Sequence, residues 1–184
     1  MIALKEKSHN IKDYKLLPEG APYQLIEGEL VMTPAPNPRH QIISANLFKT
    51  ISKYVDEREE GIVLYSPIDI YLDNENVYQP DIVFIPNQRR EIIKDDGIYG
   101  APDLVVEILS PSTAYYDLRK KFRIYEKYGI REYWIVDPEM DSVDVYLNEQ
   151  GHFSLTGKAE GKGELESAVL KGFKVTLNEV FSRM

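Results

Sequence analysis

The sequence predicts a single α/β domain whose helices flank a mixed central sheet, with one added hairpin near the N-terminus and another near the C-terminus. Three observations lead to this fold class. Apolar residues recur at helical spacing in residues 39–57 and 114–128. Between and after these stretches lie short segments rich in β-branched and aromatic residues. One of them, residues 103–109, is apolar almost throughout, as is typical of a strand buried on both faces.

The first predicted elements are a hairpin and a long helix. Residues 23–32 predict two short strands that turn at Glu27-Gly28. A helix is expected over residues 39–57, where apolar side chains form one stripe: Ile43, Leu47, Ile51 and Tyr54. The single domain spans residues 1–184, and residues 1–14 are expected to form a flexible arm.

The middle of the chain predicts a long hairpin, a loop and the buried strand. Residues 62–72 and 77–86 are rich in β-branched and aromatic residues, and the polar residues 73–76 predict the turn between them. Residues 89–99 are polar and predict a loop with a single helical turn. The apolar strand at residues 103–109 follows this loop.

The last part of the chain predicts a helix, a strand, a hairpin and a terminal helix. The helix at residues 114–128 is expected to bury one stripe of side chains: Leu118, Phe122 and Tyr125. A strand is expected at residues 131–138 and a hairpin at residues 142–155. We expect Asn178 to cap a short C-terminal helix.

The composition limits the possible classes of function. Hydrophobic residues make up 43% of the chain and charged residues 28%, as in ordinary soluble domains. Because there is no cysteine and only three histidines, carboxylates are the expected ligands of any metal ion. No signal peptide or membrane span is apparent, so we expect a cytoplasmic protein that does not bind a membrane.

The charge distribution restricts nucleic-acid binding to a local patch. A net charge of −8 disfavours a protein whose whole surface binds phosphate groups. Residues 115–131 nevertheless carry six basic and two acidic residues, and Lys120, Arg123 and Lys127 are among the basic ones. This segment is either a solvated helix face or a weak, salt-sensitive surface that guides the DNA backbone. A homodimer would join two such patches.

Glu107 places a carboxylate in the middle of the apolar strand. Strand alternation puts Glu107 on the face of Val105, while Val106 lies on the opposite face, and both faces are expected to be buried. An unpaired buried carboxylate costs several kcal/mol. A basic partner, a set of hydrogen-bond donors or a metal ion must therefore compensate it.

Asp81 is a second carboxylate next to an apolar strand, which it opens directly after Pro80. Taken alone, Asp81 suits a strand entrance and Glu107 suits a buried ion pair. On adjacent strands the two carboxylates would converge, and they would repel each other unless a cation lay between them. Oxygen ligands of this kind suit Mg²⁺ or Mn²⁺, so a hydrolytic metal site explains both residues.

Several motifs occur in an informative order. Pro80-Asp81 is followed, after a gap, by the strand that holds Glu107, and this pair resembles the PD-(D/E)XK nuclease superfamily. The strings APDLVVEILSPST, DLRKKFRIY and YGIREYWIVDP, after YQLIEGELVMTPAPNPRHQ and VYQPDIVFIP, resemble the Uma family of putative restriction endonucleases. The resemblance covers roughly residues 15–150. It implies a restriction-endonuclease-like fold and Mg²⁺-dependent endonuclease activity on DNA.

The resemblance also implies a set of metal ligands and a catalytic lysine. Asp81 and Glu107 would hold the metal ion, with the backbone carbonyl of Ile108 as a third ligand. The superfamily lysine is expected two residues after the acid, where this chain has Leu109. The resemblance places Lys121, on the following helix, in its stead.

The direction of the Lys121 side chain agrees with that role. Lys121 lies three residues after Leu118 and four before Tyr125, so it shares their inward side, whereas Lys120 points elsewhere. The alternative is a surface ion pair between Asp117 and Lys121 at i,i+4 spacing.

The resemblance further implies an acid from the N-terminal element. Glu29 is the best match and Glu27 is a second candidate, although either one could be a solvent-facing strand residue. His40 faces inward at the start of the first long helix, close to where such an acid would lie. His40 could therefore bind at the site or only cap the helix.

The expected function is a Mg²⁺- or Mn²⁺-dependent endodeoxyribonuclease with four catalytic residues: Asp81, Glu107, Lys121 and Glu29. His40, Lys120, Arg123 and Lys127 are the expected substrate contacts. Two alternatives stay open. One is a non-catalytic binding module in which Glu107 and Lys121 form a metal-free buried ion pair. The other is a nuclease that acts on RNA or on a small nucleotide.

Overall fold

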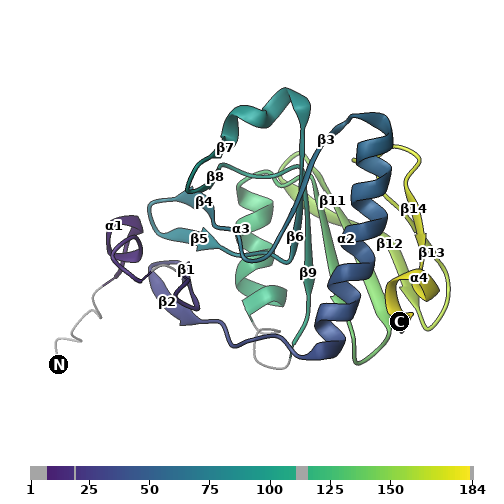
Figure 1. The fold of residues 1–184 in the computed structure, drawn as a ribbon, viewed down its shortest axis with the longest axis horizontal. Coiled ribbons are helices and arrows are strands. Elements are labelled where there is room, and N and C mark those ends of the chain that lie inside the picture. The colour runs from purple at the N-terminus through teal and green to yellow at the C-terminus, as the bar shows by residue number, and fades with distance from the viewer. Residues whose placement is uncertain (1–7, 19, 111–115, 183–184) are drawn as a thin grey trace.

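The computed structural model describes residues 8–18, 20–110 and 116–182, with the backbone alone for residues 116–118. The central sheet has six strands in the order β12 (His152–Glu160), β11 (Ser142–Glu149), β10 (Glu132–Asp137), β9 (Leu104–Ile108), β6 (Ile82–Pro86) and β3 (Gly61–Tyr65). β9 runs parallel to β10 and antiparallel to β6, so the sheet is mixed, as predicted. Figure 1 shows this sheet in the middle of the molecule, with helices on both sides.

A second six-stranded sheet packs beside the first. Its order is β2 (Glu29–Met32), β1 (Tyr23–Ile26), β5 (Asn76–Tyr78), β4 (Ile70–Asp73), β8 (Gly97–Tyr99) and β7 (Ile93–Lys94). A two-stranded sheet, β13 (Glu164–Glu166) with β14 (Lys174–Thr176), follows near the C-terminus. The helices are α1 (Ile11–Tyr14), α2 (Pro38–Arg58), the 3₁₀ helix η1 (Asn87–Ile92), the π-helix η2 (Tyr116–Lys121), α3 (Phe122–Lys127) and α4 (Leu177–Phe181).

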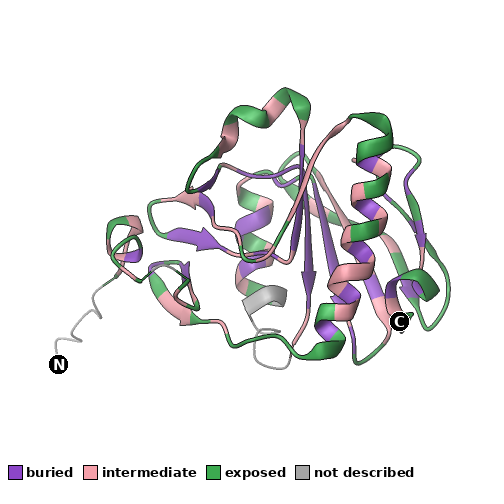
Figure 2. Ribbon diagram, in the orientation of Figure 1, coloured by how far each residue is buried: buried purple, intermediate pink, exposed green. Residues whose placement is uncertain are grey.

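The central sheet is buried on both faces, and each face has its own apolar core. Strand alternation sends Leu104, Val106 and Ile108 of β9 into a core with the apolar stripe of α2. Val105 enters the opposite core, with α3 and the second sheet. Figure 2 shows the resulting run of buried residues through the central strands. Glu107 shares the face of Val105, and so it lies on the side of α3.

The long predicted hairpin at residues 62–86 divides between the two sheets. Its outer parts, β3 and β6, pair in the central sheet, and its inner parts, β4 and β5, pair in the second sheet. Pro67 and Pro80 interrupt the two arms, and proline cannot donate a hydrogen bond to a continuous ladder. The Ser66 N–H still donates to the Asp81 carbonyl at 2.9 Å, so the two interruptions lie side by side. The break leaves Asp81 at the entrance of β6.

Other elements differ in detail from the sequence-based predictions. The predicted loop at residues 89–99 contains the expected helical turn, η1, but also the short strands β7 and β8. The β13–β14 hairpin was not predicted. Asn178 as the cap of the terminal helix is wrong, because the Thr176 hydroxyl accepts the Glu179 N–H and the Glu179 carboxylate accepts the Thr176 N–H.

The helix predicted at residues 114–128 is present as η2 and α3, while residues 111–115 lie outside the described residues. Phe122 and Tyr125 pack into the core as expected, and the Leu118 side chain is not described. Of the predicted N-terminal arm, residues 8–14 are described, and Tyr14 is buried against the second sheet. In the described part of the chain, no helix is long and apolar enough to cross a membrane.

Glu132 provides a test of the central sheet. Its buried carboxylate accepts hydrogen bonds from Trp134 Nε1 at 2.6 Å and from the backbone N–H groups of Ala168 and Val169 at 2.6 and 2.9 Å. Glu132→Gln presents an amide to these donors, and we expect a loss of about 2–3 kcal/mol in the free energy of unfolding. Urea unfolding followed by the fluorescence of the single tryptophan measures this loss. The exposed change Glu139→Gln is the control, and equal midpoints for the two variants would contradict the expectation.

Candidate active site

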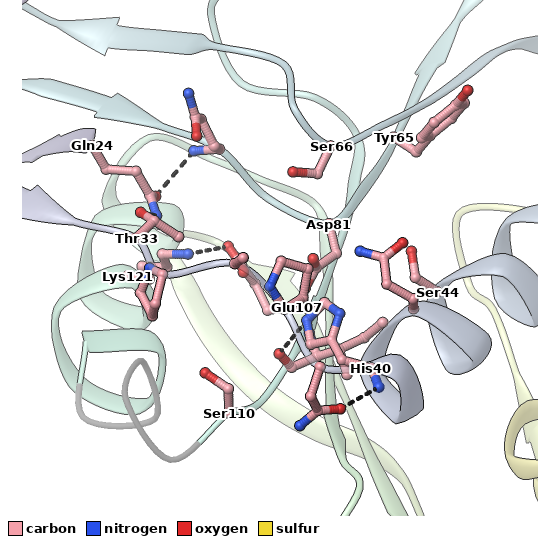
Figure 3. A pocket seen from close by; sticks show the side chains of 17 residues that line it. Gln24, Thr33, His40, Ser44, Tyr65, Ser66, Asp81, Glu107, Ser110 and Lys121 are labelled. Atoms are coloured by element: carbon pink, nitrogen blue, oxygen red, sulfur yellow. Dashed lines mark hydrogen bonds and ion pairs between the residues drawn. The ribbon is translucent and has the colours of Figure 1, made fainter. Parts of the chain in front are cut away.

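A cavity of about 480 Å³ opens where the two sheets meet the start of α2. Five of the residues that the sequence singled out line it: His40, Asp81, Glu107, Ile108 and Lys121. Figure 3 shows the side chains of His40, Asp81, Glu107 and Lys121 converging from α2, from the entrance of β6, from the end of β9 and from η2. Segments far apart in the sequence therefore build one site.

Asp81 is held by the backbone of the neighbouring strand. Its Oδ2 atom accepts the Ile108 N–H at 2.8 Å and lies 3.3 Å from Nε2 of His40. The same Nε2 atom lies 3.1 Å from the Ile108 carbonyl oxygen. The carboxylate and the carbonyl thus point toward one position, and the imidazole of His40 contacts both.

The start of α2 fixes the position of His40. The Asn37 side chain caps the helix by accepting the His40 N–H at 2.9 Å, and Pro38 occupies the first turn. The helix is therefore capped by Asn37, and the His40 side chain lies in the cavity, nearly buried at 8% exposure. Of the two positions considered from the sequence, the structure places His40 at the site.

Glu107 is compensated by two donors from the following helical segment. Lys121 Nζ and the Tyr125 hydroxyl each lie 2.7 Å from Oε1 of Glu107. The side chains of Lys121 and Glu107 are 3% and 4% exposed. Burial, followed by the negative charge of Glu107, raises the pKa of Tyr125 well above its ordinary value. The hydroxyl therefore keeps its proton and donates a hydrogen bond to the carboxylate.

Neighbouring residues of η2 point in different directions. Lys121 turns inward to Glu107, whereas Lys120 Nζ lies 2.9 Å from Oε2 of Glu29 at the surface. This difference in direction was expected from the helical spacing. Leu109, two residues after Glu107, is apolar and offers no cation. The ammonium group that contacts Glu107 comes instead from Lys121 on the following helical segment.

The other predicted site residues lie outside the lining of the cavity. The Glu29 side chain is 57% exposed and pairs with Lys120. A guanidinium nitrogen of Arg123 lies 3.6 Å from Oε1 of Glu27, and Nζ of Lys127 lies 5.0 Å from the centroid of the Tyr128 ring. The acids of the β1–β2 turn and strand thus partly neutralise the predicted basic patch.

Gln24 is a cavity residue that the sequence reasoning missed. It is 3% exposed, donates through Nε2 to Thr33 Oγ1 at 3.0 Å, and accepts the Gln79 N–H at 3.0 Å. Strand β1 therefore sends an amide to the cavity, and the catalytic role expected of Glu29 stays a prediction. A polar residue on the same strand face as Ile26 was the available signal.

The donor atoms of the site suit a hard divalent cation in type. Asp81 and Glu107 offer carboxylates, Ile108 offers a carbonyl oxygen, and Mg²⁺ and Mn²⁺ prefer such ligands. The arrangement is not a ready-made cation cage. Among residues 8–18, 20–110 and 116–182, no group of three or more His, Asp or Glu side chains is placed to hold a metal ion. Glu107 instead faces Lys121.

The chain is similar to known proteins over most of its length. The model of the Uma2 family, described as "Putative restriction endonuclease", matches residues 11–178. Two proteins of Synechocystis sp. are related: Uncharacterized protein slr1290, 28% identical over 79% of this chain and 77% of that protein, and Uncharacterized protein sll1609, 23% identical over 67% and 70%. The fold matches the crystal structure of a putative nuclease belonging to DUF820 from Anabaena variabilis, with a TM-score of 0.78, 22% identity, and 94% and 97% of the two chains covered.

The Glu107–Lys121 pair predicts a specific pattern of stabilities. Lys121→Met leaves the carboxylate buried without its cation, and we expect a loss of roughly 3–5 kcal/mol in the free energy of unfolding. The double change Glu107→Gln with Lys121→Met removes both charges and should recover much of that loss. Urea unfolding in EDTA measures these values, with the exposed Lys171→Met as the control. The two groups do not interact if the double variant loses as much unfolding free energy as the single variants Glu107→Gln and Lys121→Met lose together.

Proposed function

The chain belongs to the Uma2 family, and from this membership and the geometry of the cavity we propose that it is a divalent-metal-dependent endonuclease that hydrolyses phosphodiester bonds in DNA. One observation carries the proposal. Two carboxylates, a backbone carbonyl and a lysine, from three separate elements of the fold, converge on one cavity. Hydrolysis of a phosphodiester needs stabilisation of negative charge and an oriented water, and this set of groups can supply both.

Three residues would hold the cation: Asp81 and Glu107 by their carboxylates and Ile108 by its carbonyl oxygen. Mg²⁺ or Mn²⁺ at this position would activate a water molecule and neutralise charge on the phosphate. The Ile108 N–H already fixes the direction of the Asp81 carboxylate. His40 Nε2 contacts both Asp81 and the Ile108 carbonyl, and His40 would therefore position these oxygens.

Lys121 would stabilise the phosphate as the reaction proceeds. Glu107 holds its ammonium group at a fixed place, so little reorganisation is needed when negative charge develops on the non-bridging oxygens. The bond from the water oxygen to phosphorus would form while the bond from phosphorus to the leaving oxygen breaks, and the proton that the water loses would end on the leaving oxygen. A cation aimed at the non-bridging oxygens lowers the energy of that transition state.

DNA would approach over the basic residues near the cavity. Lys120, Arg123 and Lys127 would guide the phosphate backbone, although Glu29 and Glu27 already engage the first two. Binding should be weak and salt-sensitive because the net charge of the chain is −8. A homodimer in the cytoplasm would join two patches and bind more tightly.

A binding module without catalysis is the second candidate. The observation that favours it is the Glu107–Lys121 pair itself, which satisfies the buried carboxylate without a metal ion. A retained fold can serve binding after activity is lost. Both candidates use the same cavity and differ in whether a cation acts there.

Cleavage assays separate the two candidates. Purified protein is incubated with plasmid, single-stranded DNA and RNA in Mg²⁺, Mn²⁺ or EDTA, and we expect cleavage of DNA that requires the cation. Asp81→Asn and Glu107→Gln should each lower the rate roughly 100-fold or more. Glu164→Gln, an exposed acid on β13, is the control and should cleave normally. No cation-dependent cleavage of any substrate, together with a Glu107→Gln variant that alters only stability, would favour the binding module.

The position of Glu29 predicts a change in DNA affinity. Glu29→Gln removes the carboxylate that engages Lys120, so at low salt we expect DNA to bind a few-fold more tightly, while the cleavage rate at saturating DNA stays near that of the native chain. Glu164→Gln changes the net charge equally at a distant site. Loss of cleavage in Glu29→Gln would instead support the catalytic role that the sequence predicts for Glu29.

A further inference from the structure

Tyr65 lines the cavity and is unusually exposed for an aromatic residue. It ends β3, immediately before Ser66, and 59% of the residue is accessible to solvent. Phe48 of α2 packs against its ring at 4.6 Å between centroids and an interplanar angle of 62°. Figure 3 shows Tyr65 above Asp81 and Ser44, with the hydroxyl end of its ring turned away from both. The ring is therefore braced by α2 and still open to a ligand.

The remaining walls of the cavity are mostly neutral and polar. Amides and hydroxyls supply much of the lining: Gln24, Asn37, Gln41, Ser44, Ser66 and Gln79. Of the lining residues, Lys121 and His40 are the two that can carry positive charge, and both already contact an acid. Electrostatic attraction for phosphate is therefore small here, and a ligand would be held by stacking and hydrogen bonds.

The size of the cavity selects among nucleic-acid ligands. About 480 Å³ lies in the range of pockets that enclose a small molecule. A base pair held between two backbones in a duplex is too large to enter a pocket of this size. One nucleotide whose base is unpaired can enter, and base stacking on an aromatic ring tolerates any sequence.

We propose that the cavity binds an unpaired nucleotide with its base stacked on Tyr65, so that single-stranded DNA is the preferred substrate class. That the bound strand is a substrate rests on the proposed function, whereas the binding itself does not. Tyr65 would act as a positioning residue that brings the adjacent phosphodiester toward Asp81 and Lys121.

Binding in EDTA tests the proposal without cleavage. A short fluorescein-labelled oligonucleotide of mixed sequence is titrated as a single strand, as the matching duplex and as RNA, and anisotropy reports binding. We expect the DNA single strand to bind more tightly than the duplex. Tyr65→Ala should weaken single-strand binding roughly tenfold, while Tyr65→Phe should retain it. Tyr99→Ala removes an exposed aromatic outside the cavity lining and should have no effect.

The outcomes distinguish this inference from the proposed function. Equal binding of single strand and duplex, or single-strand binding that Tyr65→Ala leaves unchanged, would overturn the inference even if DNA is cleaved. Preferential binding of RNA would overturn the choice of DNA. Tyr65-dependent binding without cation-dependent cleavage would support the inference and contradict the proposed nuclease activity. If Tyr65→Ala does not fold by tryptophan fluorescence, Tyr65→Leu keeps apolar packing on Phe48 without an aromatic ring and decides the same question.

Discussion

The buried carboxylate of Glu107 is the constraint on which the arrangement around the site depends. A central strand covered on both faces can hold this charge only if donors reach it from the layer above. Lys121 and Tyr125 do so from consecutive turns of one helical segment, each at 2.7 Å from the same oxygen. The docking of η2 and α3 on the sheet is thereby fixed by polar contacts as well as by apolar packing. The site and the core share these residues, so stability and chemistry are linked.

Local periodicity predicted the parts of the fold that depend on neighbours in sequence. Strand alternation placed Glu107 on the face of Val105, and helical spacing separated Lys121 from Lys120. The division of the long hairpin between two sheets was beyond such reasoning. Each arm has the composition of one continuous strand, and the interruptions at Pro67 and Pro80 mark a change of sheet only once both sheets exist.

The candidate site was predictable to the same extent. Asp81 and Glu107 stand out because acids are costly in apolar strands, and they do lie at one cavity. The contribution of the N-terminal hairpin was harder, because it depends on how β1 pairs with β5 across the second sheet. That pairing turns Gln24 to the cavity and leaves Glu29 at the surface. A neutral amide among apolar residues carries little signal by itself, whereas an acid there attracts notice.

The charge balance of the cavity connects cation and substrate. Glu107 and Lys121 cancel each other, and the Asp81 carboxylate lies beside the imidazole of His40. A phosphodiester therefore finds no surplus of positive charge among these residues. If a divalent cation and the phosphate share the site, each must favour the binding of the other by the same free energy. Affinity then has two separable sources: stacking on Tyr65, which needs no cation, and attraction of the phosphate, which does. A site built in this way would discriminate against the abundant paired DNA, because paired bases cannot supply the first source.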